Sequence, residues 1–310
     1  MKKWFFLIIS SLVGCQSAPV IPSSTVIIEQ THLKANDAQS HLEHSQFQHK
    51  DHPIVALVLG SGGARGYAHI GAIESLEKNG IRPDFIVGTS AGSIVGALYA
   101  SGKSASDLRQ IALNMKVQDV RGFKFDKQGF LDGEKVEDFV NHQIKNMPLQ
   151  SMQIPLFVVA TELKTGKKTV FNYGNTGQAV RASVAIPSMF VPAKINQQEY
   201  VDGGLVSPVP VEVAKQLGAD IVIAVDILAQ PKYTETTNMW GMFNQNINIM
   251  QHQMSKTELK QADIIIRPDI REKAHIFDVK ERDNTMLAGE IATQQHIPEL
   301  KKMIQNYQMQ

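Results

Sequence analysis

The feature that most constrains this chain is a Gly-Thr-Ser-Ala-Gly pentapeptide centred on Ser90. An apolar run at residues 85–87 precedes it and predicts a buried strand, while the small-residue stretch 91–100 predicts a helix. A serine on a sharp turn from strand to helix projects its hydroxyl into a cleft, and flanking glycines let the backbone bend and approach closely. The pattern therefore predicts Ser90 as a nucleophile on a turn that needs Gly88 and Gly92.

The neighbouring sequence alternates between strand and helix patterns. Residues 54–59 form a continuous apolar run ending in glycine, which suits a strand buried on both faces. Residues 66–78 have helical spacing and end at Asn79-Gly80, a C-cap signal. This alternation predicts an α/β domain with a mainly parallel sheet covered by helices. Further strands are expected at 156–160, 169–172 and 221–227.

A glycine-rich loop, Gly-Ser-Gly-Gly-Ala-Arg-Gly at 60–66, links the first expected strand to the first helix. Such a loop can present successive backbone N–H groups to an anion. A dinucleotide fingerprint needs glycines at positions one, three and six, but the sixth residue from Gly60 is Arg65. No Gly-Lys-Ser/Thr follows, so a mononucleotide P-loop is excluded as well. The loop fits an oxyanion hole better, built from the amides around Gly62, Gly63 and Ala64.

A third motif, Asp202-Gly203-Gly204, follows a short expected strand at 199–201. Taken alone, Asp-Gly-Gly is more often a turn than a catalytic site. In this order, however, the glycine loop, the serine turn and the Asp-Gly-Gly resemble the patatin-like phospholipases. The sequence Arg-Ala-Ser-Val-Ala-Ile-Pro at 181–187 also resembles a segment that recurs in that family. The resemblance covers roughly residues 54–228.

The resemblance implies an acyl hydrolase on a three-layer α/β/α sandwich. It implies Ser90 as the nucleophile, Asp202 as the base, and the amides from Gly62 to Arg65 as the oxyanion hole; it implies no metal and no organic cofactor. The family loop often begins with glycine where this chain has Ser61. Because an aspartate near its usual pKa of about 3.9 is a weak base, we expect a partly desolvated cleft to strengthen it.

Two other classes of function stay open. A generic α/β-hydrolase esterase or peptidase needs a histidine after the serine and the acid. None of the downstream histidines stands in a glycine-rich loop after a strand, so we interpret them as surface residues: His142, His252, His275 and His296. His69 is expected to pack within the first helix. The second alternative is a lipoprotein whose glycine loop binds phosphate or a nucleotide without chemistry.

The N-terminus predicts secretion and lipid anchoring. Residues 1–14 begin with Met-Lys-Lys and continue with an apolar run of signal-peptide length, too short to span a bilayer comfortably. The ending Leu-Val-Gly-Cys resembles the lipobox of bacterial lipoproteins, which implies acylation of Cys15 and cleavage just before it. Gln16, rather than aspartate, favours the outer over the inner membrane by resemblance to enteric lipoproteins. We therefore expect an extracytoplasmic lipoprotein.

Residues 15–52 are polar, without a sustained apolar period, and predict a flexible tether between the lipid anchor and a hydrolase domain at 53–310. The tether's five histidines share no helical face, so we do not interpret them as a metal site. The whole chain carries 31 basic and 30 acidic residues, a net charge of +1. It therefore offers no broad basic field for nucleic acid. An acyl ester such as a phospholipid is the expected partner.

Two further regions carry open interpretations. Residues 113–148 hold several phenylalanines among glycines and lysines, and predict either a lid over an acyl-chain cleft or a connection with one helix near 134–144. Residues 239–254 form a methionine-rich apolar stripe. We expect this stripe to pack in the core as one face of an amphipathic helix, and contact with an acyl chain or a membrane is the alternative.

Overall fold

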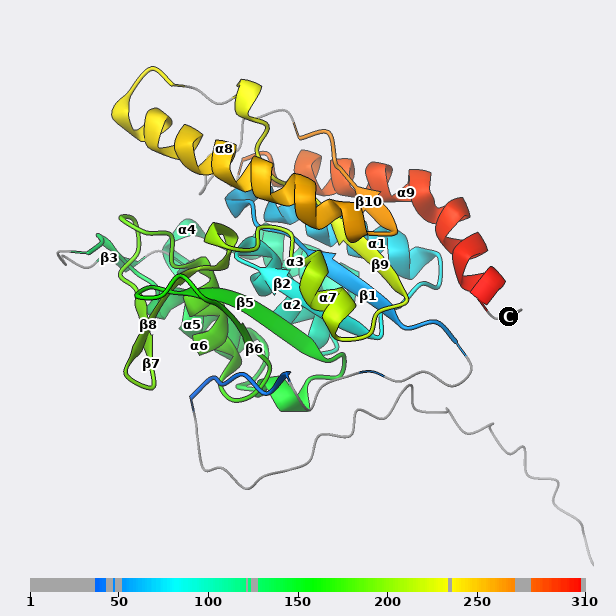
Figure 1. The fold of residues 1–310 in the computed structure, drawn as a ribbon, viewed down its shortest axis with the longest axis horizontal. Helices are drawn as coiled ribbons and strands as arrows, with labels where there is room; N and C mark the ends of the chain where they lie inside the picture. Colours follow the sequence, from blue (N-terminus) through cyan, green and yellow to red (C-terminus); the bar gives the residue numbers. More distant parts are fainter. Residues whose placement is uncertain are drawn as a thin grey trace, which may run out of the picture.

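The computed structural model describes residues 37–42, 47, 52–120, 122–123, 128–233, 236–270 and 280–307. Within these residues the central sheet has eight strands in the order β10-β9-β1-β2-β5-β8-β7, and β6 pairs with β5 (Figure 1). The strands are β1 (Val55–Leu59), β2 (Phe85–Thr89), β5 (Leu156–Glu162), β6 (Lys168–Phe171), β7 (Ala193–Ile195), β8 (Gln198–Asp202), β9 (Ile221–Val225) and β10 (Ile264–Ile266). A separate two-stranded sheet joins β3 (Gly122–Phe123) to β4 (Leu131–Asp132).

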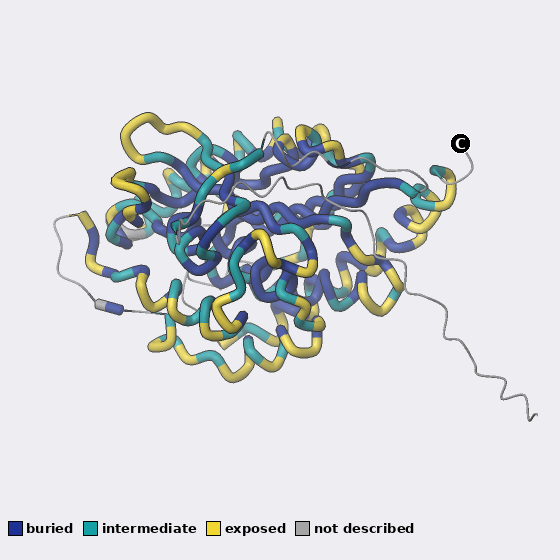
Figure 2. Tube along the Cα trace, turned by 90° about the horizontal axis from the view of Figure 1, so that it is seen from below, coloured by how far each residue is buried: buried dark blue, intermediate teal, exposed yellow. Residues whose placement is uncertain are grey.

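The middle of the sheet is parallel, as the apolar runs predict. Strands β10, β9, β1, β2 and β5 pair in parallel, whereas β6, β8 and β7 are added antiparallel to one end. Every residue of β1, β2 and β9 is buried, because helices or loops cover both faces of a parallel sheet. In Figure 2 the buried segments are concentrated in the middle of the molecule, and the exposed segments lie at its periphery.

Alternate side chains of β1 define two cores on opposite faces of the sheet. Leu57 and Leu59 belong to a large core under α1, α2, α3, α5, α6 and α9, and Ala56 and Val58 to a smaller one under α7 and η6. These two helical layers and the sheet make the expected three-layer α/β/α sandwich. The helices are α1 (Tyr67–Lys78), α2 (Ala91–Ala100), α3 (Ala105–Asn114), α4 (Val117–Val120), α5 (Glu134–Gln143), α6 (Thr176–Val184), α7 (Val211–Gln216), α8 (Met239–Glu258) and α9 (Arg282–Tyr307), with short 3-10 turns η2 (Gly63–Gly66), η3 (Leu149–Ser151), η4 (Gly203–Leu205), η5 (Pro231–Tyr233) and η6 (Leu259–Gln261).

Part of the segment expected to be a tether packs on the domain. Ala38 is buried, and Gln39 forms an antiparallel bridge with Tyr173. Phe47 is also buried, with its ring stacked on Phe85 at a centroid distance of 4.4 Å. A solvated linker over all of 15–52 is therefore wrong for these residues, because burying one aromatic side chain contributes about 1.5–3 kcal/mol. The expected signal peptide 1–14 and Cys15 lie outside the described residues.

Helix α8 differs from the expectation that the methionine-rich stripe at residues 239–254 packs in the core. Four large apolar side chains of its methionine-rich stretch are exposed, namely Met239 (91%), Met242, Ile249 and Met250. The helix instead buries two polar side chains, Gln251 and Ser255, and packs against the short turns η4, η5 and η6. It runs along the outside of the molecule, yellow to orange in Figure 1. Core packing is thus wrong for these four side chains. None of the helices that the structure describes is both long and apolar enough to cross a bilayer.

Candidate active site

Ser90 stands on a sharp turn between β2 and α2, with φ 53° and ψ −122°. A positive φ is strained for a residue with a side chain, at a cost on the order of 1–3 kcal/mol. Steric contacts explain why Gly88 and Gly92, on either side of this turn, are glycines. A Cβ on Gly92 would lie 2.0 Å from the carbonyl oxygen of Leu59 in β1, and one on Gly88 would lie 2.8 Å from that of Gly92. The turn therefore packs too tightly on itself and on β1 for any larger residue.

Two buried serines hold this strained turn. The Ser90 amide donates a hydrogen bond of 2.8 Å to Ser183 Oγ, and Ser183 Oγ donates in turn to the Val159 carbonyl at 2.6 Å. Ser93 Oγ donates to the Ser90 carbonyl at 2.6 Å. Both main-chain polar groups of Ser90 are thus satisfied inside the protein, which fixes the direction of its side chain. Ser183 belongs to the 181–187 segment singled out in the sequence, but its role could not be read from that motif.

The Ser90 hydroxyl donates a 2.6 Å hydrogen bond to Asp202 Oδ2, although the two residues are 112 positions apart. Asp202 ends β8 and is 4% exposed. Its other carboxylate oxygen accepts from the Gly204 amide at 2.7 Å, and its main-chain carbonyl accepts from Thr161 Oγ1 at 2.8 Å. Burial raises the pKa of Asp202 from its usual 3.8 to about 6, against the opposing effect of the bonds from Ser90 and Gly204. The carboxylate is therefore a stronger base than an exposed aspartate.

The two glycines after Asp202 are also required by close packing. A Cβ on Gly203 would lie 2.2 Å from the carbonyl oxygen of Val159, and one on Gly204 would lie 2.8 Å from Ser61 Oγ. The Asp-Gly-Gly turn thus presses against both the central strand β5 and the glycine loop. These two close contacts explain how the Asp-Gly-Gly motif places the Asp202 carboxylate next to Ser90.

The glycine loop is fixed at several points. The amide of Ser61 donates to the Pro208 carbonyl at 2.8 Å, and Gly63 has φ 57°, in the left-handed region that favours glycine. The amide of Arg65 donates to the Gly62 carbonyl at 3.2 Å, and its Nε donates to the Ile227 carbonyl at 2.9 Å. The Arg65 amide is therefore engaged within the loop. Gly62, Gly63 and Ala64 stand at the start of η2, where N–H groups have no partner within the helix.

His69 anchors the first residue of this loop. Its side chain is fully buried in α1, and its Nε2 hydrogen-bonds the carbonyl of Gly60 at 2.8 Å. Burial lowers the pKa of His69 to about 4, so the ring is neutral near pH 7. The expectation that it packs in the first helix is confirmed; its bond to the loop was not expected.

A histidine triad finds no support among the described histidines, since none of them hydrogen-bonds Ser90 or Asp202. His142 is exposed at the end of α5, and His296 lies 3.8 Å from Glu299 on the surface of α9. His252 lies on α8, partly exposed. His275 lies outside the described residues. Within the described part of the chain, no three His, Cys, Asp or Glu side chains group as metal ligands would.

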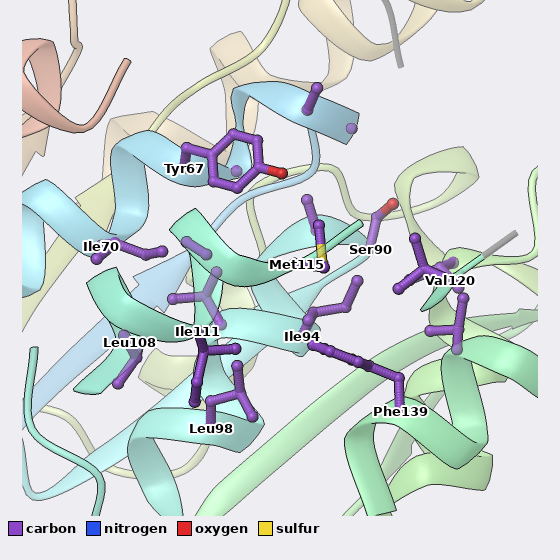
Figure 3. A pocket seen from close by; sticks show the side chains of 18 of the residues that line it. Tyr67, Ile70, Ser90, Ile94, Leu98, Leu108, Ile111, Met115, Val120 and Phe139 are labelled. Atoms are coloured by element: carbon purple, nitrogen blue, oxygen red, sulfur yellow. The ribbon is translucent and has the colours of Figure 1, made fainter. Parts of the chain in front are cut away.

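An apolar cavity of about 160 Å³ opens beside Ser90 (Figure 3). Ser90 lies toward one end in Figure 3, and Leu98, Leu108 and Ile111 lie toward the other. Gly63 and Ala64 are also among the lining residues. Ser90 and Leu98 are eight residues apart on α2, so the cavity follows the helix for about 12 Å. Among the residues that the structure describes, none that lines the cavity is charged. The region 113–148 supplies part of its wall: Met115 after the end of α3, Val117 and Val120 from α4, and Val136 and Phe139 from α5.

An α/β sandwich with a serine on a strand-to-helix turn, hydrogen-bonded to a carboxylate, is an arrangement typical of serine hydrolases. Residues 57–215, just over half of the chain, match the family model described as patatin-like phospholipase. The chain therefore belongs to the patatin-like phospholipase family, a family of carboxylic ester hydrolases.

Several known proteins are similar to this chain. An uncharacterized NTE family protein of Mycobacterium tuberculosis is 36% identical over 181 residues, which cover 56% of this chain and 49% of that protein. The human patatin-like phospholipase domain-containing protein 6 is 29% identical over 208 residues, covering 63% of this chain and 15% of that protein. The chain thus spans about half the length, or less, of these curated relatives.

Two solved structures are similar over most of the chain at low identity. VipD from Legionella pneumophila has a TM-score of 0.47 and 14% identity, covering 88% of this chain and 72% of that one. Full-length ExoU of Pseudomonas aeruginosa, in complex with SpcU, has a TM-score of 0.47 and 14% identity, covering 91% and 61%.

Proposed function

We propose that this chain hydrolyses acyl esters with a Ser90–Asp202 dyad. The observation that carries the proposal is the 2.6 Å hydrogen bond from Ser90 Oγ to a buried carboxylate, beside an apolar cavity that Ser90 lines. A serine hydroxyl is a weak nucleophile until an adjacent base accepts its proton. The raised pKa of Asp202, about 6, brings this carboxylate closer to neutral pH, where a base works best.

In the proposed reaction Ser90 Oγ forms a bond to the ester carbonyl carbon while its proton passes to Asp202 Oδ2. The C–O bond to the leaving alcohol then breaks as Asp202 returns the proton to that oxygen. Water attacks the acyl-serine, again giving its proton to Asp202. The free acid leaves when the proton returns to Ser90 Oγ, which restores the dyad.

The negative charge on the carbonyl oxygen needs hydrogen-bond donors during both attacks. The amides of Gly63 and Ala64 are the donors we propose, because both residues line the cavity with Ser90 and stand at the start of η2. Gly62 packs more tightly, since a Cβ there would lie 2.6 Å from the Ile227 side chain. We assign Arg65 a structural role through its bonds to Gly62 and Ile227.

The cavity indicates the substrate class. The described residues of its wall are uncharged and almost all apolar, which favours a fatty acyl chain, since burying apolar surface contributes about 25 cal/mol per Å². Its volume of about 160 Å³ is close to that of an engineered apolar cavity of about 150 Å³ that binds benzene. We therefore propose phospholipids, or other lipid esters, as substrates, with the acyl chain lying along α2.

Hydrolysis of a fluorogenic phospholipid by the full-length chain, beside Ser90→Ala, tests this proposal. We expect turnover in the wild type and loss of at least about 10³-fold in the variant. Ser101→Ala is a control for removing a serine hydroxyl, because Ser101 Oγ bonds only the Leu98 carbonyl at the far end of α2. Equal activity of the wild type and Ser90→Ala would exclude Ser90 as the nucleophile.

We also propose that acylated Cys15 anchors the protein to the outer membrane. The support is the sequence: a Met-Lys-Lys start, an apolar run, Leu-Val-Gly-Cys and the following Gln16. Metabolic labelling with an alkyne fatty acid in a bacterial host is expected to mark the wild type, in the outer-membrane fraction. Cys15→Ser is expected to lose the label. An unlabelled wild type would contradict the anchor, and a labelled inner-membrane protein would contradict its location.

A further inference from the structure

Three segments of the proposed site meet at one short turn, residues 207–209. Thr89 Oγ1, next to the nucleophile, donates to the Ser207 carbonyl at 3.0 Å. The amide of Ser61, in the glycine loop, donates to the Pro208 carbonyl at 2.8 Å. The amide of Ser207 donates to the carbonyl of Gly203, beside the catalytic carboxylate, at 2.9 Å. The position of this turn therefore sets the spacing between nucleophile, base and oxyanion donors.

One carboxylate holds the turn from outside. Glu258, the last residue of α8, accepts a hydrogen bond from Ser207 Oγ on one oxygen. Its other oxygen accepts from the Val209 amide at 2.9 Å. Ser207 is fully buried, so its hydroxyl depends on this partner. Both oxygens of one side chain thus fix both ends of the three-residue turn.

A simple packing role does not explain a carboxylate here, because withdrawing a charge from water costs free energy that an apolar side chain would not. Burial raises the pKa of Glu258 to about 7, against the lowering by its bonds to Ser207 and Val209. Lys168 also lowers this pKa and Glu212 raises it. Lys168, which is partly buried, and Glu212, which is exposed, form their own ion pair at 2.6 Å.

We infer that Glu258 is a positioning residue for the proposed acyl transfer, acting through the 207–209 turn on Thr89 and Ser61. The inference rests on the function proposed above. Only the ionised carboxylate accepts both hydrogen bonds at full strength, since hydrogen bonds to a charged group are stronger than neutral ones. Protonation of Glu258 therefore loosens the turn and slows the reaction without removing any group that contacts the substrate.

Glu258→Gln tests the inference because it keeps the shape and removes the charge. We expect kcat for a fluorogenic phospholipid to fall by about 10- to 100-fold at pH 8, the size of effect that a misplaced site produces, with KM changed less than about twofold. In the wild type, kcat should fall as the pH is lowered through about 7, where Glu258 is protonated. Glu258→Gln should lack this fall in kcat and keep only the fall near pH 6, where Asp202 is protonated.

Glu212→Gln is the matched control, because it removes a neighbouring carboxylate that does not bond the turn. It is expected to keep the wild-type kcat at pH 8, with the step near pH 7 retained but moved to lower pH, because Glu212 raises the pKa of Glu258. Ser207→Ala removes the same hydrogen bond from the other side, and should lower kcat in the same direction even if Glu258→Gln fails to fold. If either Glu258→Gln or Ser207→Ala kept the kcat and pH profile of the wild type, the positioning role of Glu258 would be overturned, and the proposed ester hydrolysis would stand. A wild type as inactive as Ser90→Ala would overturn both it and the proposed function.

Discussion

Ser183 supports the strained backbone of Ser90 from a distance of 93 residues, by accepting the Ser90 amide on its side-chain oxygen at 2.8 Å. Because the bond is buried, losing the acceptor leaves an unsatisfied N–H at the turn, which costs about 1–3 kcal/mol. We predict that Ser183→Ala lowers the free energy of unfolding by this amount and also lowers kcat. Denaturant unfolding and ester hydrolysis of the same preparation measure the two effects.

Ser75→Ala is the control for Ser183→Ala. Ser75 is an equally buried serine in α1 whose hydroxyl bonds Gln294 at 3.2 Å, on the face of α1 that packs against α9. It is expected to lose some stability with unchanged kcat. If Ser183→Ala also kept its full kcat, the Ser90 turn would not depend on this bond.

Asp202→Asn is predicted to abolish activity and to stabilise the fold at neutral pH. The folded protein binds the Asp202 proton more tightly than the unfolded chain, since the pKa is about 6 rather than 3.8. Wild-type stability therefore falls as pH rises through this interval, by up to about 3 kcal/mol. The variant lacks that loss, so its advantage in free energy of unfolding should grow between about pH 4 and about pH 7.

Denaturant unfolding of wild type and Asp202→Asn at several pH values measures this difference. Asp132→Asn is a control, because Asp132 is a carboxylate in β4 beside Arg181, away from Ser90. A difference that stays constant over the whole pH range would show that Asp202 is not held by burial in the folded protein.

The rate at which a fluorophosphonate labels Ser90 should follow the ionisation of Asp202. Only the ionised carboxylate can accept the serine proton, so labelling is expected to rise with pH through a step near 6, below the step near 7 that we assign to Glu258. Mass spectrometry of quenched samples gives the rate at each pH. A rate that is flat between about pH 5 and about pH 7, where the proposed base should titrate, argues for another base.

The far end of the cavity should set the preferred acyl length. Leu98→Trp places a larger side chain about 12 Å from Ser90 along α2. We predict a loss of activity on long-chain esters with short-chain esters kept, and an overpacking cost of about 1–3 kcal/mol. Rates on a series of p-nitrophenyl esters measure the shift, with Leu287→Trp on the exposed face of α9 as control. An unchanged chain-length profile would show that acyl chains do not reach Leu98.

The sheet and the dyad could be predicted because each leaves a local mark in the sequence. A strand buried on both faces must be apolar throughout, as residues 55–59 are, and a serine turn packed against β1 must have glycines on both sides. Asp202 was identified from its motif and the resemblance. The Gly-Gly that follows it is a steric requirement that the structure explains.

Other features depend on contacts between distant residues. Nothing near Ser183, His69 or Glu258 in the sequence indicates which backbone group each will bind, because the partners arrive from other elements. The methionine stripe of α8 has the same helical period whether it faces the core or water, so its exposure could not be read from spacing. Phe47 has no apolar period around it in the sequence, so nothing local predicts that its ring stacks on Phe85.

Covalent labelling of the 310-residue chain is the sharpest test of the Ser90–Asp202 dyad. The protein, at about pH 8, is treated with a fluorophosphonate that mimics an acyl ester, digested and analysed by mass spectrometry, beside Asp202→Asn. We expect one modified serine, Ser90, in the wild type, and labelling at least about 10²-fold slower in the variant. Modification of a different serine, or equal labelling of Ser90 in both proteins, would contradict the Ser90–Asp202 dyad.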